Sequence, residues 1–540
     1  MRSRARSLES RERELPPHVI HQPETTHSGA KITPPQLDLP KRTTSICPEC
    51  RRLIPALIRE EDGKVVMEKT CPEHGEFKDV VYSDVEFYLK AKEWFFGDGR
   101  GFSNPQVPDP KDECPLNCGI CSRHTSNTAL ANIDLTNRCN LKCPICFANA
   151  AVTGYLYEPS YEQVVEMLKV LRERKPVPVA CVQFSGGEPT IHPDFIRIIR
   201  TAREMGFAAI QVATNGLKFA DLEFAQEAKE AGLHSLYLQF DGLDDEIYIK
   251  TRGRRLLETK LKAIENARKV GMKVVLVPTV VRTVNDHQLG DMVKFAIKNV
   301  DVISGISFQP VSFTGRIKRE ERERFRFTIS DLAIKVEEQT GFIKADGWVP
   351  ICAEVPLSRL FAAIEGHEVT TYSCHPHCGA ATYLFVDDEG NAVQITDFLD
   401  LKGLLREMDQ LADKLSRSRF NIKLLSGLRA LNVLRKYFIK EKAPKGLTFK
   451  RFLATIDELR SNKYERDPNQ VGKNSYRSLM VGGMHFMDAY NYDVERVRRC
   501  VIHYVAPNGR MYPFCAYNSG PVFRERIERR FSVPYKGEER

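Results

Sequence analysis

The stretch that decides the fold is Cys139-Asn-Leu-Lys-Cys143-Pro-Ile-Cys146, which places three cysteines in one short loop at spacings of four and three. Most iron–sulfur clusters that only carry electrons are held by four cysteines. Three thiolates leave one iron of a cubane cluster without a protein ligand, and catalytic metal sites keep such an open position. A zinc knuckle or half of a ferredoxin motif is the simpler alternative. We predict that this loop holds a cluster with one open iron.

The segments that follow this loop alternate between apolar strands and amphipathic helices. We expect six strands, at residues 131–136, 180–185, 208–214, 235–241, 273–279 and 303–309. Alternating strands and helices predict a parallel sheet or barrel, with its chemistry at the carboxyl ends of the strands. The predicted fold class is therefore α/β, a partial (β/α)6 barrel whose first strand runs directly into Cys139.

Polar or glycine residues stand at the ends of the predicted strands. The second strand ends in Ser185-Gly186-Gly187-Glu188, and adjacent glycines let the backbone approach a ligand closely. The later strands end near Asn215, Gln239 and Asp241, Thr279, and Gln309. Each short motif alone is a common turn. In this order and at barrel spacing, they predict a ligand site around the three-cysteine loop.

A separate metal knuckle precedes the barrel. Cys47-Pro-Glu-Cys50 and Cys71-Pro-Glu-His74 flank a predicted hairpin strand at residues 64–69. Three thiols and one imidazole complete a tetrahedral set, as in a zinc ribbon or a rubredoxin-type iron site. We expect a Zn or Fe ion here with a structural or electron-relaying role.

The remaining cysteines predict auxiliary clusters. Cys114, Cys118 and Cys121 repeat the CxxxCxxC spacing before the first strand, and Cys352, Cys374, Cys378, Cys500 and Cys515 follow the barrel. We expect one or two auxiliary clusters, with three alternatives for their ligands. A histidine (His375, His377 or His503) completes one cluster, or Cys181 joins it, or a single cluster leaves free thiols. Cys181 lies inside the second strand, where a buried core thiol is the favoured interpretation.

Composition limits what the chain can do. It has 540 residues, 42% of them hydrophobic, and a formal net charge of +9, which is typical of a large protein with several domains. No apolar run approaches the roughly 20 residues that cross a bilayer. The first 42 residues lack an apolar segment, so we expect a disordered arm rather than a signal peptide. Fifteen cysteines in metal-type groups indicate a reducing cytoplasm.

Residues 401–470 are basic and amphipathic. Lysines and arginines from Lys414 to Lys445 interleave with apolar residues such as Phe420, Leu431 and Phe438. Such segments bind an anionic membrane surface or a partner, and the plainer alternative is a solvated helix packed on the barrel. We expect no nucleic-acid partner, because no recognition module accompanies the charge.

The three-cysteine loop, the Gly-Gly-Glu strand end and the six strands together resemble the radical S-adenosylmethionine (SAM) superfamily. One departure is Ile145, where many members carry an aromatic residue, with Phe147 following instead. The resemblance implies that Cys139, Cys143 and Cys146 are catalytic and hold a [4Fe-4S] cluster whose open iron binds SAM. It implies that the remaining SAM contacts come from Ser185, Gly186, Gly187, Glu188, Asn215, Gln239, Asp241, Thr279 and Gln309. An electron donor such as ferredoxin or flavodoxin is expected, because SAM is cleaved reductively.

The cysteine-bearing segments on either side of the barrel resemble one family within this superfamily. Residues 45–520, with CPEC…CPEHG, CPLNCGICSRH and HFMDAYNYD…RRC…PFC, resemble the archaeal tetraether lipid synthases. That family implies coupling of unactivated carbons at two lipid chain ends, a lipid substrate, and a cytoplasmic protein peripheral to the membrane. The alternatives are a methylase of a pterin-like molecule, a peptide-modifying maturase and a non-enzymatic electron carrier. A long apolar groove would favour lipid, and a small pocket with hydrogen-bonding groups would favour a pterin.

These expectations divide the chain into six segments. They are a disordered arm (1–42), a metal knuckle with auxiliary-cluster cysteines (43–125), the radical SAM partial barrel (126–320), barrel completion with auxiliary ligands (321–400), the basic helical segment (401–470) and a C-terminal auxiliary-cluster segment (471–540).

Overall fold

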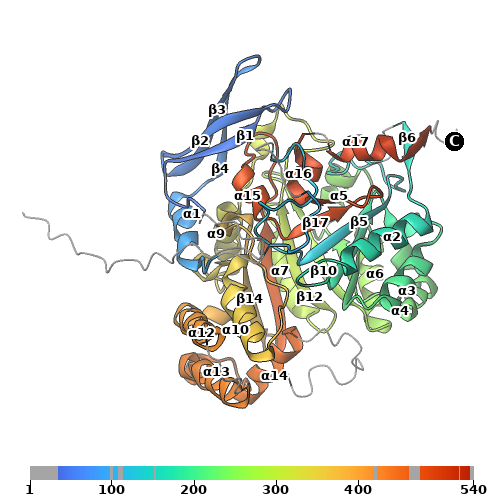
Figure 1. Ribbon diagram of the computed structural model, residues 1–540. Helices are drawn as coiled ribbons and strands as arrows, with labels where there is room; N and C mark the ends of the chain where they lie inside the picture. The colour runs from blue at the N-terminus through green and yellow to red at the C-terminus, as the bar shows by residue number, and fades with distance from the viewer. Residues whose placement is uncertain are drawn as a thin grey trace, which may run out of the picture.

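The structure is a computed structural model that describes residues 35–97, 101–107, 114–150, 154–417, 423–460, 475–521 and 523–534 (Figure 1). Most of the predicted arm, residues 1–34, lies outside this described part. Residues 35–40 lead into the first strand, which begins at Lys41, and Leu37 and Lys41 are buried. Every helix among the described residues is too short or too polar to cross a bilayer.

The N-terminal metal knuckle is a four-stranded antiparallel ribbon. Its strands, in sheet order, are β1 (Lys41–Ile46), β2 (Leu53–Glu61), β3 (Lys64–Cys71) and β4 (Gly75–Tyr82). Asp62 and Gly63 join β2 to β3 with φ of 51° and 73°, as a tight hairpin turn of two left-handed residues requires. Helix α1 (Val85–Lys90) follows, with the Asp84 side chain capping its amino end.

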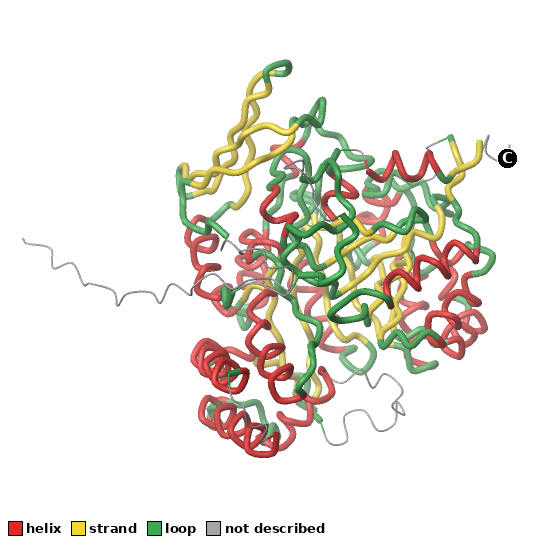
Figure 2. The backbone as a smooth tube through the Cα atoms, in the orientation of Figure 1, coloured by secondary structure: helices red, strands yellow, loops and turns green. Residues whose placement is uncertain are grey.

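The central sheet contains all six predicted strands. They are β5 (Leu130–Thr136), β7 (Cys181–Gly186), β8 (Ala209–Thr214), β9 (Ser235–Gln239), β10 (Lys273–Val277) and β12 (Ile303–Pro310). Each pairs in parallel with the next. The helices between them are α2 (Tyr161–Arg172), α3 (Phe195–Glu204), α4 (Leu222–Ala231), α5 (Asp245–Arg252), α6 (Leu257–Lys269) and α7 (Leu289–Lys298). The mixed α/β fold with a partial barrel is therefore confirmed, with helices outside the strands (Figure 2).

The C-terminal part of the chain extends this sheet at both edges. Strand β16 (Arg477–Met484) pairs in parallel with β12, and β17 (Ile502–Val505) pairs in parallel with β5. Strands β13 (Val349–Pro350), β14 (Gly379–Val386), β15 (Ala392–Gln394) and β18 (Met511–Pro513) add antiparallel pairs outside them. Sequence periodicity did not predict these strands, because they lie far along the chain from the six-strand repeat.

The other elements surround the sheet. They are β6 (Tyr155–Tyr157), α8 (Arg322–Phe325), α9 (Ile329–Thr340), α10 (Val355–Glu365), α11 (Ile395–Phe398), α15 (Val494–Arg498), α16 (Phe514–Ser519), α17 (Phe523–Arg530) and β19 (Ser532–Pro534). The short strand β11 (Thr279–Val280) belongs to the sheet itself and pairs in parallel with β12. Strand β19 pairs with β6, so the described C-terminus lies beside the segment that follows the three-cysteine loop.

The basic segment forms three helices, α12 (Leu401–Ser416), α13 (Lys423–Tyr437) and α14 (Phe449–Arg460), at the opposite end of the molecule from the ribbon (Figure 1). Much of its apolar surface packs inside the protein, where Phe452 and Phe438 contact Phe398 and Phe452 also contacts Phe385 of β14. The plainer alternative, a helix packed on the barrel, is therefore the better description. Leu428 and Leu431 of α13 are the exposed large apolar residues of this segment among the described residues.

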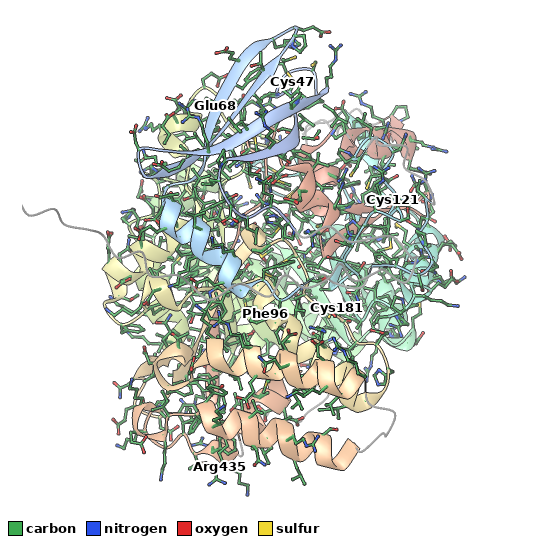
Figure 3. The ribbon with its side chains drawn as sticks, turned by 60° about the vertical axis from the view of Figure 1, so that its left-hand side comes forward. Cys47, Glu68, Phe96, Cys121, Cys181 and Arg435 are labelled. Carbon is green, nitrogen blue, oxygen red and sulfur yellow. The ribbon has the colours of Figure 1, made fainter. Side chains whose placement is uncertain are left out.

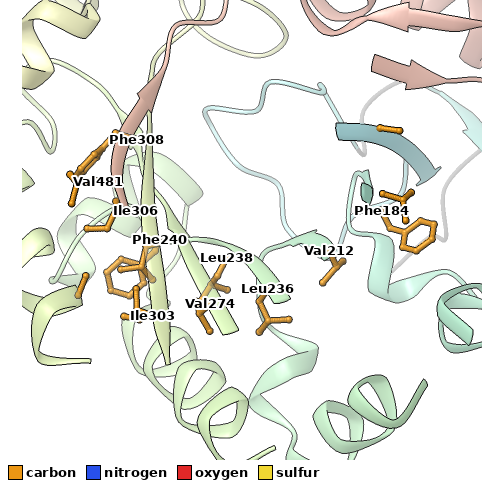
Figure 4. Packing of buried hydrophobic residues seen from close by; sticks show 14 of the residues in the cluster. Phe184, Val212, Leu236, Leu238, Phe240, Val274, Ile303, Ile306, Phe308 and Val481 are labelled. Atoms are coloured by element: carbon orange, nitrogen blue, oxygen red, sulfur yellow. The ribbon is translucent and has the colours of Figure 1, made fainter. Parts of the chain in front are cut away.

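The main core lies between the strands and the surrounding helices. Leu236, Leu238 and Val274 point outward from the barrel and are fully buried (Figure 4). The neighbouring residues on β9, Ser235, Tyr237 and Gln239, face the opposite side and are half-buried. The two faces of a strand alternate, so the barrel presents an apolar outer surface to its helices and a polar, partly accessible inner surface.

Candidate active site and metal centres

The three-cysteine loop lies at the carboxyl end of β5. Cys146 exchanges two backbone hydrogen bonds with Arg316, of 3.0 and 2.9 Å, and the Arg252 guanidinium donates to the Ile145 carbonyl at 3.0 Å. Burial raises the pKa of the Cys139 thiol to about 12 and also raises that of Cys143. Buried thiols resist ionisation, and a bound cationic iron centre offsets that cost. Three convergent, partly buried thiols therefore fit an iron–sulfur cluster.

Gly186 and Gly187 are required because the cysteine loop passes directly over them. A Cβ at Gly187 would lie 2.0 Å from the Arg138 carbonyl oxygen, and one at Gly186 would lie 2.3 Å from that of Thr136. The Gly187 and Glu188 amides donate to these same two carbonyls, at 2.7 and 2.9 Å. The glycines thus hold the start of the cysteine loop against the end of β7.

Glu188 is buried and accepts several hydrogen bonds from its own chain. Its carboxylate accepts from the Thr190 and Thr214 hydroxyls at 2.6 and 2.7 Å and from the Asn215 amide at 2.8 Å. Burial raises its pKa. Glu188 therefore links the ends of β7 and β8, and its predicted contact with SAM stays a prediction.

The predicted residues of the fourth and fifth strands meet at one charged network. Asp241 accepts from the Gln239 side chain at 2.6 Å and from the Thr279 amide at 3.1 Å, and it is paired with Arg252. Lys260 of α6 donates to Gln239 at 2.7 Å and to the Asn215 carbonyl, and burial lowers its pKa to about 7. Four predicted residues are thus brought together.

Sequence reasoning missed Arg252 and Lys260. Arg252 ends α5 next to Gly253, whose positive φ of 80° stops the helix. The Thr-Arg-Gly sequence was therefore a usable signal that a fixed arginine follows the fourth strand. Lys260 gives no such signal, because its burial on α6 depends on tertiary packing.

Ser185 and Gln309 lie on the inner wall of the barrel. The Ser185 hydroxyl donates to Asp134 at 2.7 Å, and Asp134 is paired at 2.6 Å with Arg524 of the C-terminal helix α17. The Gln309 amide donates to the Tyr237 hydroxyl at 3.0 Å, which donates to Ser307 at 2.8 Å. Ser185 and Gln309 are therefore separate from the Asp241 network.

The inner wall continues as a row of carboxamides. The Gln183 side chain donates to Asn132 at 2.7 Å, and Gln211 donates to Gln183 at 2.9 Å. Together with Tyr237 and Gln309 they place amide and hydroxyl groups on five of the six barrel strands, all except β10. Burying such groups without hydrogen-bond partners is costly, so this surface suits a polar ligand better than an alkyl chain.

The ribbon contains a preformed metal site. One ligand atom from each of Cys47, Cys50, Cys71 and His74 lies within 4.8 Å of the others, and Cys47 is labelled in Figure 3. A hydrogen bond from His74 holds the pKa of Cys71 at about 6, so this thiol ionises readily. The four donors fit a tetrahedral Zn or Fe ion. The predicted ligand set is brought together as expected.

The auxiliary cysteines need one correction. Eight cysteines lie outside the ribbon, the three-cysteine loop and β7: Cys114, Cys118, Cys121, Cys352, Cys374, Cys378, Cys500 and Cys515. Eight thiols suffice for two four-cysteine clusters, so neither a histidine nor Cys181 is needed as a ligand. Cys181, labelled in Figure 3, is the first residue of β7, whereas the three-cysteine loop follows the carboxyl end of the parallel strand β5.

The candidate histidines have other partners. His377 lies 3.0 Å from the Tyr88 carbonyl oxygen, and His503 lies 2.9 Å from the Thr128 hydroxyl and 3.0 Å from His124. His375 lies 3.6 Å from Glu495. Cys352, Cys374 and Cys378 form one packed group, and Cys114 and Cys118 pack with Cys515 in another.

The chain is similar in sequence to several known proteins. The chain matches the Radical SAM superfamily model over residues 133–296 and the HMPTM N-terminal zinc ribbon domain over residues 39–83. It is 45% identical over 496 residues to the 7,8-dihydro-6-hydroxymethylpterin dimethyltransferase of Methanocaldococcus jannaschii, covering 92% of this chain and 96% of the relative. It is 24% identical to the GTP 3',8-cyclase of Clostridium acetobutylicum, covering 56% and 92%. The solved structure of Streptococcus suis SuiB aligns with a TM-score of 0.33 at 21% identity, covering 41% and 47%.

The name of the methanogen relative contradicts the lipid-coupling interpretation. That relative is a pterin dimethyltransferase, which corresponds to the pterin alternative of the sequence analysis. The predictions of a lipid substrate and of a membrane partner are therefore wrong as well. The polar inner wall agrees with this correction, because an alkyl chain offers no hydrogen bond to groups such as the buried Asn132 amide nitrogen, which has no partner among the described residues.

Proposed function

Because the chain belongs to the radical SAM superfamily, in the same family as the Methanocaldococcus jannaschii pterin dimethyltransferase, we propose that it is a radical SAM methyltransferase that acts on a pterin-like heterocycle. The observation that carries the proposal is the polar inner wall of the barrel. Its amides and hydroxyls, from Gln211, Tyr237, Ser307 and Gln309, suit the hydrogen-bonding edge of a fused heterocycle.

Different residues of the barrel would have different roles in this reaction. Cys139, Cys143 and Cys146 hold a [4Fe-4S] cluster, and Gly186 and Gly187 fix the loop that carries them. When bound, the cluster and SAM supply a carbon radical able to remove hydrogen from an unactivated carbon, which no side chain can do. The Asp241–Arg252–Lys260 network presents fixed charges beside the cysteine loop, where SAM's polar groups are expected.

The substrate is expected deeper in the barrel than SAM. Tyr237 and Gln309 already hydrogen-bond each other, so they are held in place before a ligand enters. Preorganised polar groups orient a ligand without further ordering. The ring's amide edge would therefore meet Tyr237 and Gln309 while its reacting carbon faces the cysteine loop.

We also propose that the eight auxiliary cysteines hold two four-cysteine clusters. Burial and then the nearby Cys378, Cys352 and Cys500 raise the pKa of Cys374 well above its usual range, and we assign these four to one set. Cys500 lies near Cys515 as well as Cys378, and we assign Cys515 to the other set because it packs with Cys114 and Cys118. Cys114, Cys118, Cys121 and Cys515 form the other. Metal binding would offset the cost of ionising these buried thiols.

The test is an anaerobic assay of reconstituted enzyme with 7,8-dihydro-6-hydroxymethylpterin, a low-potential reductant as the electron source, and SAM as both the radical source and the methyl donor. Mass spectrometry would follow 5′-deoxyadenosine and the pterin, with an isoprenoid diether lipid as a control substrate. A pterin heavier by one or two methylene groups supports the proposal. SAM cleavage with an unchanged pterin, or a changed lipid, overturns it while leaving the superfamily assignment in place.

A further inference from the structure

We infer that the metal-bound ribbon is a positioning element for the three-cysteine loop, and that it acts through residues 487–493. This inference does not depend on which substrate the enzyme uses. It rests on buried polar side chains of the ribbon that bond to residues far along the chain. An independent ribbon would have no reason to bury charge against another part of the protein.

The first link joins the metal site to Ala489. Lys69 lies two residues before the metal ligand Cys71, and Ser45 lies two residues before Cys47. The Lys69 ammonium donates to the Ser45 hydroxyl at 2.9 Å and to the Ala489 carbonyl at 2.6 Å, and Lys69 is only 5% exposed. A metal that fixes the ends of β1 and β3 therefore also fixes the donor that holds Ala489.

A second link joins the ribbon to Asp488, the residue before Ala489. Asp79 of β4 is paired with Arg326 at 2.5 Å, and Arg326 is paired with Asp488 at 2.7 Å. All three side chains are buried. A buried charge left unpaired is strongly unfavourable, so these three side chains must move together.

Asp488 then holds the end of strand β12. Its carboxylate accepts from the Phe313 amide at 2.9 Å, and the Ser312 hydroxyl donates to the Met487 carbonyl at 3.3 Å. Phe313 also packs with Tyr490 in an apolar group that includes Phe77 of the ribbon and Ile145. Ile145 stands between the cluster ligands Cys143 and Cys146.

The last link reaches the cluster ligand itself. Three residues beyond Phe313, Arg316 exchanges both backbone hydrogen bonds with Cys146. Between them, Gly315 has a φ of 68°, and a Cβ there would lie 2.3 Å from the Cys146 carbonyl oxygen. Because the two segments touch backbone to backbone, a shift of Phe313 displaces Cys146.

A positioning role and an electron-relay role require different properties of the ribbon metal. Positioning needs only a tetrahedral ion that closes the ribbon, so Zn and Fe should serve equally. An electron relay requires a redox-active ion, because Zn has no accessible second oxidation state. The identity of the ribbon metal therefore separates the two roles.

The adjacent residues Lys69 and Glu68 give a matched pair of variants. They point to opposite faces of β3, and Glu68, labelled in Figure 3, pairs with Arg59 and Lys78 on the ribbon alone. We would compare Lys69→Met, Cys50→Ser and the control Glu68→Gln in cluster-loaded enzyme. Two readouts apply: amide hydrogen exchange over residues 311–317, and the electron paramagnetic resonance signal of the reduced cluster with SAM.

The expected result is that Lys69→Met and Cys50→Ser accelerate exchange at Phe313 by about tenfold and alter the signal of the SAM-bound cluster. Glu68→Gln should change neither, and Zn-loaded and Fe-loaded ribbons should protect equally. Melting temperatures would separate loss of positioning from general unfolding. If Cys50→Ser does not fold, Lys69→Met carries the same test. Unchanged exchange and signal in Lys69→Met, or protection by Fe but not Zn, would overturn the inference.

Discussion

Asp241 and Arg252 form a two-pronged ion pair at the carboxyl end of the barrel, with Oδ2–Nε and Oδ1–Nη2 distances of 2.5 and 2.9 Å. Both side chains are buried, and Arg252 also donates to the Thr279 hydroxyl at 3.0 Å. The pair therefore ties the fourth strand end to the fifth and to the cysteine loop through Ile145. Four of the nine residues that we expect around SAM, namely Asn215, Gln239, Asp241 and Thr279, meet in the network around this pair.

Replacing Arg252 with Lys should lower activity at least about tenfold, because an ammonium cannot reproduce the planar two-pronged geometry. Asp241→Asn should cost about 3–5 kcal/mol of unfolding free energy, since it leaves a buried charge unpaired. The rate of SAM cleavage would measure the first effect, and chemical denaturation would measure the second. Arg268→Lys, at the more exposed pair with Asp301, is the control and should change neither. Equal effects at the two sites would refute the special role of Arg252.

Adding a methyl group at Gly187 should displace the three-cysteine loop. The new Cβ would lie 2.0 Å from the Arg138 carbonyl oxygen, so backbone must move. We expect Gly187→Ala to lose iron from the cluster, as measured by iron analysis and absorbance after reconstitution. Gly427→Ala on α13 is the contrast, because nothing lies within 4 Å of its Cβ. It should raise the unfolding free energy by about 0.5–1 kcal/mol through helix propensity.

We predict that protonation of Asp488 lowers the free energy of unfolding in acid. Burial alone would raise its pKa, but the charge and hydrogen bonds of Arg326 hold the pKa at about 2. Its pKa in the unfolded chain is about 3.9. Because the folded pKa is the lower one, the stabilisation is complete above the unfolded value and is lost as pH falls from about 4 to about 2.

The measurement for Asp488 is unfolding free energy against pH for the native chain and for Asp488→Asn. The variant should be less stable at neutral pH and should show a shallower slope below pH 4. A slope that is identical in the two proteins would show that other carboxylates account for the acid sensitivity.

Tyr237 and Gln309 separate the proposed substrate site from the SAM site. Tyr237→Phe removes a hydroxyl that is hydrogen-bonded to both Ser307 and Gln309. We expect it to raise KM for the pterin by about 10-fold, with little change in SAM affinity. Gln309→Leu should behave in the same way if Gln309 contacts substrate. If Gln309→Leu weakens SAM binding instead, the original expectation that Gln309 contacts SAM is correct.

The sequence predicted the barrel well because its information is local. The six strands alternate with helices, and the residues at their ends follow directly from strand position. The polar contacts that complete the site are not local. Arg524 reaches Asp134 from α17, and Asp79 pairs with Arg326 across 247 residues of chain.

The prediction of a lipid substrate was wrong for a different reason. The flanking cysteine motifs indicate metal ligands and lie outside the inner wall of the barrel, so they did not describe the substrate site. The discriminating feature was the inner face of β9 and its neighbours. The alternation of polar and apolar residues was visible in the sequence at Ser235, Tyr237 and Gln239. Only the structure shows which of the two faces lines the barrel interior, because there the apolar residues of the other face lie under the helices.

The assignment of the auxiliary cysteines to two clusters predicts how much iron each cysteine variant binds. If Cys352, Cys374, Cys378 and Cys500 hold one cluster, Cys374→Ser should lower bound iron by about four atoms per chain, the content of one cubane cluster. Cys181→Ser is the matched control, because its thiol begins β7 away from the site, and it should retain full iron. SAM cleavage should persist in Cys374→Ser, since Cys139, Cys143 and Cys146 are untouched. Iron loss in Cys181→Ser, or full iron in Cys374→Ser, would refute the two-cluster arrangement.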